Sequence, residues 1–214
     1  MAWPDLADIR LRVRDQLNED TASFYTDNQI DRWINDGERD IAIKGLCLES
    51  IQSLTTVAST RTVTVSCIKP LHVEYKPGSG TRLGLIKINP LQLGRLDISV
   101  STPQYWFQWG NKIGIEPKPG TTTYNLDVYT AIGPTVLLSG TTDEPQIPAE
   151  FQHLIVDYAV YRGLIRARKF SGASIIYSDY IKTLQEIRMG VITKYNNIQD
   201  DLKIPDIVVI GGES

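Results

Sequence analysis

The chain has 214 residues, of which 42% are hydrophobic and 22% are charged, and its net charge is −3. This length allows one sizeable core, or a core with a small inserted domain, and the mild acidity argues against a nucleic-acid binder. No apolar run is long enough to span a bilayer, and the first residues lack the pattern of a secretion signal. We therefore expect a protein that matures in a cytoplasm, with Cys47 and Cys67 as reduced thiols.

The first fifty residues predict two amphipathic helices joined by a short turn. Apolar side chains recur every three or four residues from Asp5 to Asn18, which is typical of a helix with one buried side. Thr26 followed by Gln29 predicts a capping box at the start of the second helix. Gly37 lies on the apolar side of that helix, where glycine costs about 1 kcal/mol relative to alanine. Close approach of the first helix or of a neighbouring subunit would explain the glycine, and so would simple tolerance.

Residues 51–147 predict an inserted antiparallel β domain, either a small sheet or a partial barrel. From about Leu54 the sequence is rich in alternating β-branched residues, which favours strands. Turn-forming residues at 77–80, 110–111 and 119–120 predict three hairpins. A helical turn is expected after Pro90.

Residues 148–200 predict a second helix pair, and residues 201–214 an extended tail. Pro148 suits the first position of a helix, and a break is expected at residues 170–172. The tail contains a strong strand former, residues 207–210, which would pair with the chain's own sheet or with a partner. The expected fold class is α+β: a helical bundle formed by residues 1–50 and 148–200, with an inserted small antiparallel β domain.

Charge is distributed unevenly along the chain. Residues 1–50 carry eleven acidic and six basic side chains, whereas residues 148–200 carry five acidic and seven basic ones. Such asymmetry would favour head-to-tail contact between copies, although solvated helix faces give the same pattern.

No motif predicts catalysis, a cofactor or a metal. The sequence contains no HExxH, GxSxG or P-loop pattern, and His153 with Asp157 has the spacing of a helix-surface pair. Strand alternation places Tyr105, Phe107 and Trp109 on one face. With almost no basic residues between them, these aromatics predict a sheet core or a protein interface ahead of a stacking platform for single-stranded nucleic acid. The nucleic-acid module is kept as an alternative, and salt-dependent binding would test it.

Three parts of the sequence together resemble the bacteriophage head-to-tail adaptor proteins, also called connectors or tail tubular proteins. The first is LADIRLRVRDQLNED with FYTDNQIDRWINDGERDIA, the second is STPQYWFQWGNKIGIEPKPGTTTYNLDVYT, and the third is TDEPQIPAEFQHLIVDYAVYRGLIRAR. They follow the family's order, cover more than half of the chain and contain structural rather than catalytic residues. The inserted β segment resembles the adaptors of short-tailed phages more than minimal helical connectors.

The resemblance implies a structural virion protein of the neck or tail, assembled in the host cytoplasm. It implies a ring of twelve copies that joins the portal protein to the next tail component, a nozzle or tail tube. Double-stranded DNA would pass through the central channel without sequence readout, and no membrane, cofactor or enzymatic activity is implied. A virion-associated peptidoglycan hydrolase built on the same connector remains the alternative.

The resemblance and the patterns also define candidate contact residues. The tail would dock on the portal or on a neighbouring subunit through Ile204, Pro205, Ile207, Val208, Val209 and Ile210. Candidates for subunit or tail interfaces are Tyr105, Phe107, Trp109, Arg162, Arg166 and Arg168.

Overall fold

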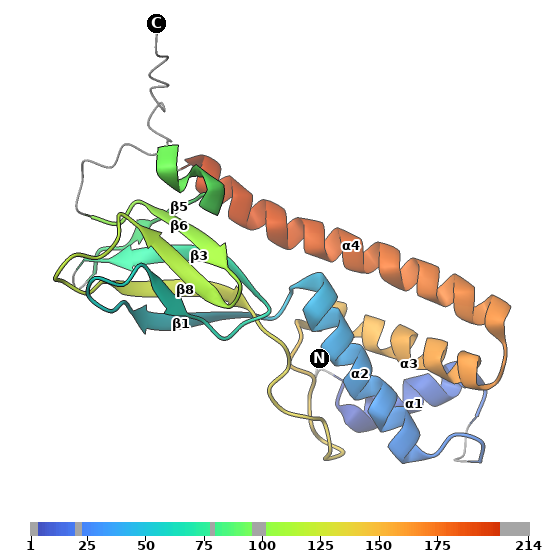
Figure 1. Cartoon of the computed structure of the whole chain (residues 1–214). Coiled ribbons are helices and arrows are strands. Elements are labelled where there is room, and N and C mark those ends of the chain that lie inside the picture. Colours follow the sequence, from blue (N-terminus) through green and yellow to red (C-terminus); the bar gives the residue numbers. More distant parts are fainter. Residues whose placement is uncertain (1–3, 20–22, 78–79, 96–101, 202–214) are drawn as a thin grey trace, which may run out of the picture. The chain divides into compact units, whose positions relative to one another are not determined.

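The computed structural model describes residues 4–19, 23–77, 80–95 and 102–201, and these combine helices with two sheets (Figure 1). The chain divides into two compact units. The helical unit comprises Met1–Ser50 and Ala131–Val191, and the β unit comprises Ile51–Thr130 and Ile192–Ser214. The predicted α+β class is therefore confirmed. None of the helices in the described ranges combines the length and apolar composition needed to cross a membrane.

The two N-terminal helices lie close to their predicted positions because their ends are encoded locally. Helix α1 spans Leu6–Leu17 and begins at Asp5, whose side chain accepts a hydrogen bond of 2.9 Å from the Asp8 backbone N–H. Helix α2 spans Asp27–Gly45 and starts with the predicted capping box, in which the Thr26 backbone N–H donates to Gln29 at 3.3 Å.

The C-terminal helices differ from expectation at the break between them. A 3-10 turn, η2, spans Ala149–Phe151, followed by α3 at His153–Arg166 and α4 at Phe170–Asp201. The predicted break at residues 170–172 is wrong, because these residues form the first turn of α4. The reversal instead occurs at Arg168, which adopts a left-handed conformation with φ of 58°, while the Lys169 N–H donates to the Leu164 carbonyl at 2.9 Å.

One hydrophobic core joins all four helices within the helical unit. Its fully buried members include Leu6, Ile9, Ile30, Ile34, Ile41 and Ile155. Two glycines allow the helices to approach closely. A Cβ on Gly37 would lie 3.1 Å from Tyr158 of α3, so the neighbour that explains this glycine is α3 rather than α1. A Cβ on Gly163 would lie 2.7 Å from Leu17.

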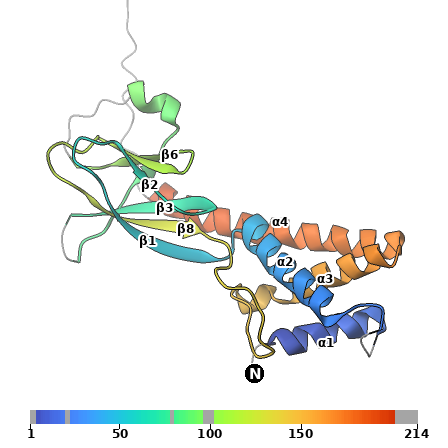
Figure 2. The ribbon, with the colours of Figure 1, turned by 60° about the horizontal axis from the view of Figure 1, so that its bottom comes forward.

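The β unit consists of two four-stranded sheets, seen as separate layers in Figure 2. The first sheet has the order β1-β8-β3-β4, with strands at Glu49–Thr55, Asn125–Ala131, Lys69–Lys76 and Leu83–Gly84. The second has the order β2-β7-β6-β5, with strands at Thr62–Thr64, Lys112–Glu116, Tyr105–Trp109 and Ile86–Lys87. The 3-10 helix η1 spans Pro90–Arg95, where a helical turn was predicted.

Strand pairing in the β unit follows some of the predicted turns and departs from others. Strands β6 and β7 form the expected hairpin, with Trp109 opposite Lys112 and Gly110 at a positive φ of 59°. The predicted third hairpin is wrong, because β7 and β8 belong to different sheets. Apolar side chains of both sheets, among them Val73, Trp106 and Val128, form the core of this unit.

The last described turns of α4 belong to the β unit and contribute an aromatic residue to it. The Tyr195 ring centroid lies 6.5 Å from that of His72 and 6.3 Å from that of Tyr129. Because His72 is buried, desolvation lowers the pKa of its imidazole below 6.5. The histidine is thus part of a packed aromatic cluster.

Candidate interaction surfaces

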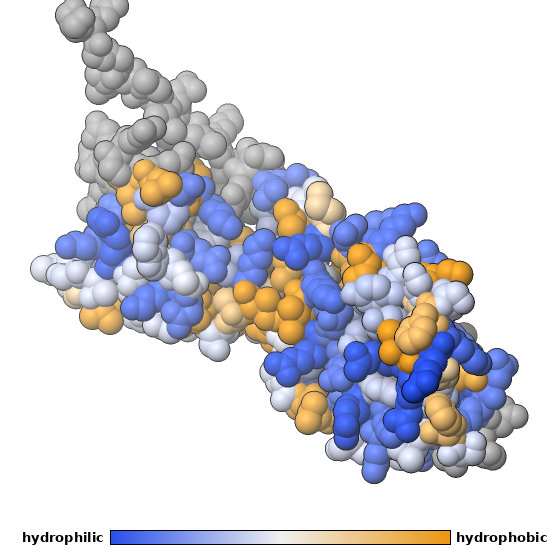
Figure 3. All heavy atoms as spheres, turned by 45° about the vertical axis from the view of Figure 1, so that its right-hand side comes forward, coloured by the Kyte–Doolittle hydropathy of each residue, from blue (hydrophilic) through white to orange (hydrophobic). Residues whose placement is uncertain are grey.

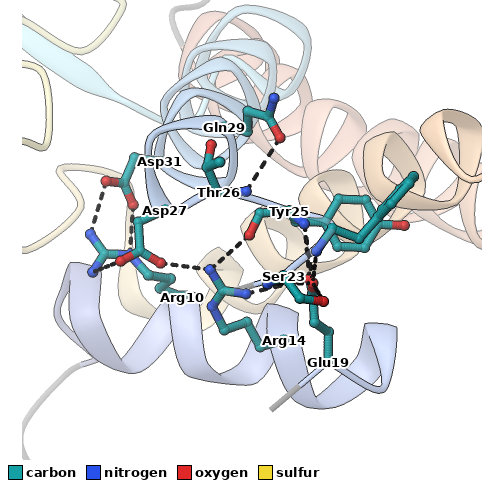
Figure 4. A network of polar contacts seen from close by, with 10 residues as sticks. Arg10, Arg14, Glu19, Ser23, Tyr25, Thr26, Asp27, Gln29 and Asp31 are labelled. Carbon is teal, nitrogen blue, oxygen red and sulfur yellow. Dashed lines mark hydrogen bonds and ion pairs between the residues drawn. The ribbon is translucent and has the colours of Figure 1, made fainter. Parts of the chain in front are cut away.

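Two arginines of α1 form ion pairs with carboxylates of α2 (Figure 4). Arg14 is buried and Arg10 is half-buried. Arg10 makes a bidentate ion pair with Asp31, with both N–O distances at 2.8 Å. Arg14 donates to Asp27 at 2.6 Å and to the Tyr25 carbonyl at 3.1 Å. Part of the N-terminal acidic excess is therefore used inside the helical unit.

The carboxylate of Glu19 organises the chain between these helices (Figure 4). It accepts hydrogen bonds from the backbone N–H groups of Ser23 at 3.0 Å, Phe24, and Tyr25 at 3.1 Å. Desolvation tends to raise the pKa of Glu19, but the three backbone donors outweigh it and lower the pKa below 4.5. The ionised carboxylate thus holds Phe24 and Tyr25 in place.

The connection from β8 to η2, residues 133–148, is held against α2 by several hydrogen bonds. The Asn35 side chain accepts from the Leu138 N–H at 2.8 Å and donates to the Leu138 carbonyl at 3.0 Å. Glu38 accepts from the Gln146 N–H at 2.5 Å. With Leu138 buried, the two preceding side chains remain outside: Val136 is 61% exposed and Leu137 is 74% exposed.

The predicted arginines lie along α3 and just beyond its C-terminal end. Arg162, Arg166 and Arg168 are all exposed, and the Arg166 guanidinium carbon lies 5.5 Å from the centroid of the Phe24 ring. Phe24 is 54% exposed and Phe170, at the start of α4, is 62% exposed. The structure thus brings Arg166 together with an apolar neighbour that the sequence pattern did not single out.

The aromatic run on β6 divides into residues with different environments. Trp106 is fully buried in the β core, and Phe107 is also buried because its ring covers Gly114 on β7. An added Cβ at Gly114 would lie 2.0 Å from the Phe107 ring. Tyr105 is half-buried, whereas Trp109 is 65% exposed. Of the three aromatics proposed as an interface, only Tyr105 and Trp109 present accessible surface.

The remaining candidates are the docking residues of the tail and the two cysteines. The proposed docking residues from Ile204 to Ile210 lie outside the described residues. Among the described residues, no group of three or more His, Cys, Asp or Glu side chains is arranged to hold a metal ion. Cys47 and Cys67 are free thiols, and burial raises the pKa of Cys47 to about 11.

Sequence reasoning missed Val136 and Leu137 as surface residues. A signal was present, since this apolar pair stands in a linker that is otherwise rich in proline, glycine and threonine. The pattern alone does not say which of the three apolar residues at 136–138 is buried. In the structure the Asn35 side chain holds Leu138, which is buried, while Val136 and Leu137 are exposed.

Comparison with known families places this chain among the structural adaptor proteins of bacteriophages. Residues 4–199 match the family described as SU10 adaptor protein, and the match extends through both units. The chain therefore belongs to the SU10 adaptor protein family, which is consistent with the predicted resemblance to head-to-tail adaptors. No curated protein matches the chain.

Proposed function

We propose that this protein is a connector that joins the portal to the tail of a bacteriophage by forming a ring around the DNA channel. The observation that carries the proposal is the family match over residues 4–199, which includes the helix pairs and the β unit alike. From the likeness to head-to-tail adaptors we infer twelve copies in the neck of the virion, assembled in the host cytoplasm. Double-stranded DNA passes through the ring without being read.

We assign different partners to different parts of the chain. Residues 204–210 dock on the portal or on a neighbouring subunit. On the β unit, Tyr105 and Trp109 are the accessible aromatics suited to the next tail component, a nozzle or tail tube. Phe107 contributes through the packing of the β6–β7 hairpin, since its ring is buried.

Co-expression with the portal protein of the same phage tests the proposal. We expect the two proteins to elute together on size exclusion, and electron microscopy of the complex to show a symmetric ring attached to the portal. The major capsid protein of the same phage serves as the control bait. A chain that elutes free of the portal at all concentrations would contradict the proposed function.

A further inference from the structure

Two exposed apolar surfaces lie at opposite ends of the helical unit, one flanked by acidic and the other by basic side chains. Both are already formed in the single chain. The first, here called the loop face, consists of Val136 and Leu137 with the exposed acidic residues Asp8 and Glu144. The second, here called the turn face, consists of Phe24, Ile165 and Phe170 with Arg166, Arg168 and Lys169. Figure 3 views the end that carries the turn face, where hydrophobic side chains lie among hydrophilic ones.

Helix α1 separates the two faces. At its start, the Leu6 N–H donates to the Asp143 carbonyl at 2.9 Å, which ties the loop to this end of the helix. At its other end, Leu17 packs against Gly163 of α3, whose carbonyl accepts from the Tyr25 hydroxyl at 2.9 Å. A helix of 12 residues is about 18 Å long, so the loop face cannot reach the turn face of its own copy.

The loop face is held in its exposed position before any partner arrives. Asn35 fixes Leu138 through two hydrogen bonds, and the Gln146 side chain accepts from the Thr135 N–H at 2.7 Å. Asp143 accepts from the Ser139 and Gly140 N–H groups at 2.8 Å and 2.7 Å. Because these bonds order the loop in advance, little conformational entropy is lost when Val136 and Leu137 are covered.

We propose that the loop face of one copy docks on the turn face of the next copy, so that Val136 and Leu137 cover Phe24, Ile165 and Phe170. The charges support a second copy as the occupant, since acidic residues flank one face and basic residues flank the other. Contact between two different faces is heterologous, and repeating it closes a ring when the rotation allows. The inference rests on the proposed function for the closed ring and names the faces that form it.

Disulfide trapping tests this contact directly. The variants are Leu137→Cys and Phe170→Cys, alone and combined, in a Cys67→Ser background of the full chain, both isolated at high concentration and bound to the portal. We expect a mixture of the two single variants to give a covalent one-to-one dimer, and the double variant to give a ladder beyond the dimer. Leu137→Cys mixed with Met189→Cys is the matched control, because Met189 is also exposed but lies on neither face.

Each outcome of the trapping bears on the inference. Cross-linking of the mixture no greater than that of the control, in both preparations, overturns it, and so does efficient cross-linking of either single variant with itself. A portal-bound ring without the ladder overturns the inference and leaves the connector function standing. A ladder formed by a chain that does not bind the portal supports the inference and contradicts the proposed function.

Discussion

At the scale of single residues, the stability of the helical unit depends on a few charged side chains that are paired by hydrogen bonds. Arg14 is 6% exposed and contacts three acceptors, of which the Tyr25 carbonyl and Glu19 lie in the connection between α1 and α2. A buried or half-buried group that loses its partner is costly, because the remaining charge is neither paired nor well solvated. The arginine therefore positions the entry to α2 as well as the helices themselves.

Replacing Arg14 tests this role. We expect Arg14→Ala to lower the free energy of unfolding by about 2–4 kcal/mol, because it leaves Glu19 without its ion-pair partner and the Tyr25 carbonyl without a donor. Arg12→Ala is the matched control on the exposed side of α1 and should change stability by less than about 0.5 kcal/mol. Chemical denaturation measures both, and equal effects would contradict the argument.

Two carboxylates should give opposite pH dependences. The backbone donors lower the pKa of Glu19 below 4.5, so its stabilising contribution is present above that pH and is lost as the pH falls through the folded-state pKa. Burial raises the pKa of Glu38 above 4.5, and the Gln146 and Ile147 N–H groups offset this only in part. The folded state therefore holds the Glu38 proton more tightly than the unfolded state does. Loss of this proton as the pH rises above 4.5 reduces the stability of the fold.

The corresponding glutamines separate the two effects. Between about pH 3.5 and about pH 7, the stability of Glu19→Gln relative to the unmodified chain should fall as the pH rises. Over the same interval the relative stability of Glu38→Gln should increase. Denaturation curves at several pH values measure both slopes, and slopes of the same sign would show that the two carboxylates have been assigned wrongly.

At the scale of elements, signals within a few residues of one another predicted the structure well. The capping box at Thr26, the apolar periodicity of α1 and the Gly110 turn all act between neighbours, and each element formed as expected. The pairing of β8 depends on β1 and β3, which are distant in the chain, and no local pattern specifies that choice. Strand β1 begins at Glu49, earlier than the expected change of period near Leu54.

The sequence indicated which types of residue could form an interface, but it did not reliably indicate which of them are exposed. The basic side chains of Arg162, Arg166 and Arg168 are exposed, as charged residues on helices usually are. Phe107 was expected to share an interface with Trp109, but its ring is buried because the residue opposite it is Gly114, which leaves room for the ring to lie flat on the neighbouring strand. Exposure of an aromatic side chain thus depends on a cross-strand partner that alternation alone does not reveal.

Two helical glycines should respond oppositely to the same substitution. Gly163→Ala places a methyl group 2.7 Å from buried Leu17, and we expect overpacking to lower stability by about 1–2 kcal/mol. Gly190 of α4 has nothing within 4 Å of an added Cβ, so Gly190→Ala should raise stability by up to about 1 kcal/mol through helix propensity. Thermal or chemical denaturation of the two variants measures the difference, and stabilisation by both would contradict close packing of α1 on α3.

At the scale of the whole molecule, the residues that stabilise the fold differ from those that we assign to assembly. The buried side chains that form the two described cores lie between Leu6 and Ile187. The faces that we assign to assembly use exposed side chains such as Leu137 and Phe170. Substitutions on these faces should therefore weaken assembly and leave the fold intact. This is the behaviour expected of a protein whose function is to bind its neighbours.

The same separation applies to the C-terminal residues proposed to dock on the portal. Deleting Lys203 to Ser214 should leave the circular dichroism spectrum and the unfolding midpoint unchanged, because the described cores are built from residues that precede this segment. Portal binding should be lost, since an apolar strand former pairs with a partner through its backbone and side chains together.

A full-length variant distinguishes the apolar content of the segment from its length. Replacing Ile207, Val208, Val209 and Ile210 by serine keeps every residue of the tail but removes the side chains that would be buried against the portal. We expect this variant to fail in portal co-purification as the deletion does, while wild type succeeds. If the serine variant binds normally and only the deletion fails, tail length or backbone pairing rather than apolar contact makes the attachment, and if both bind normally, the portal docks elsewhere on the chain.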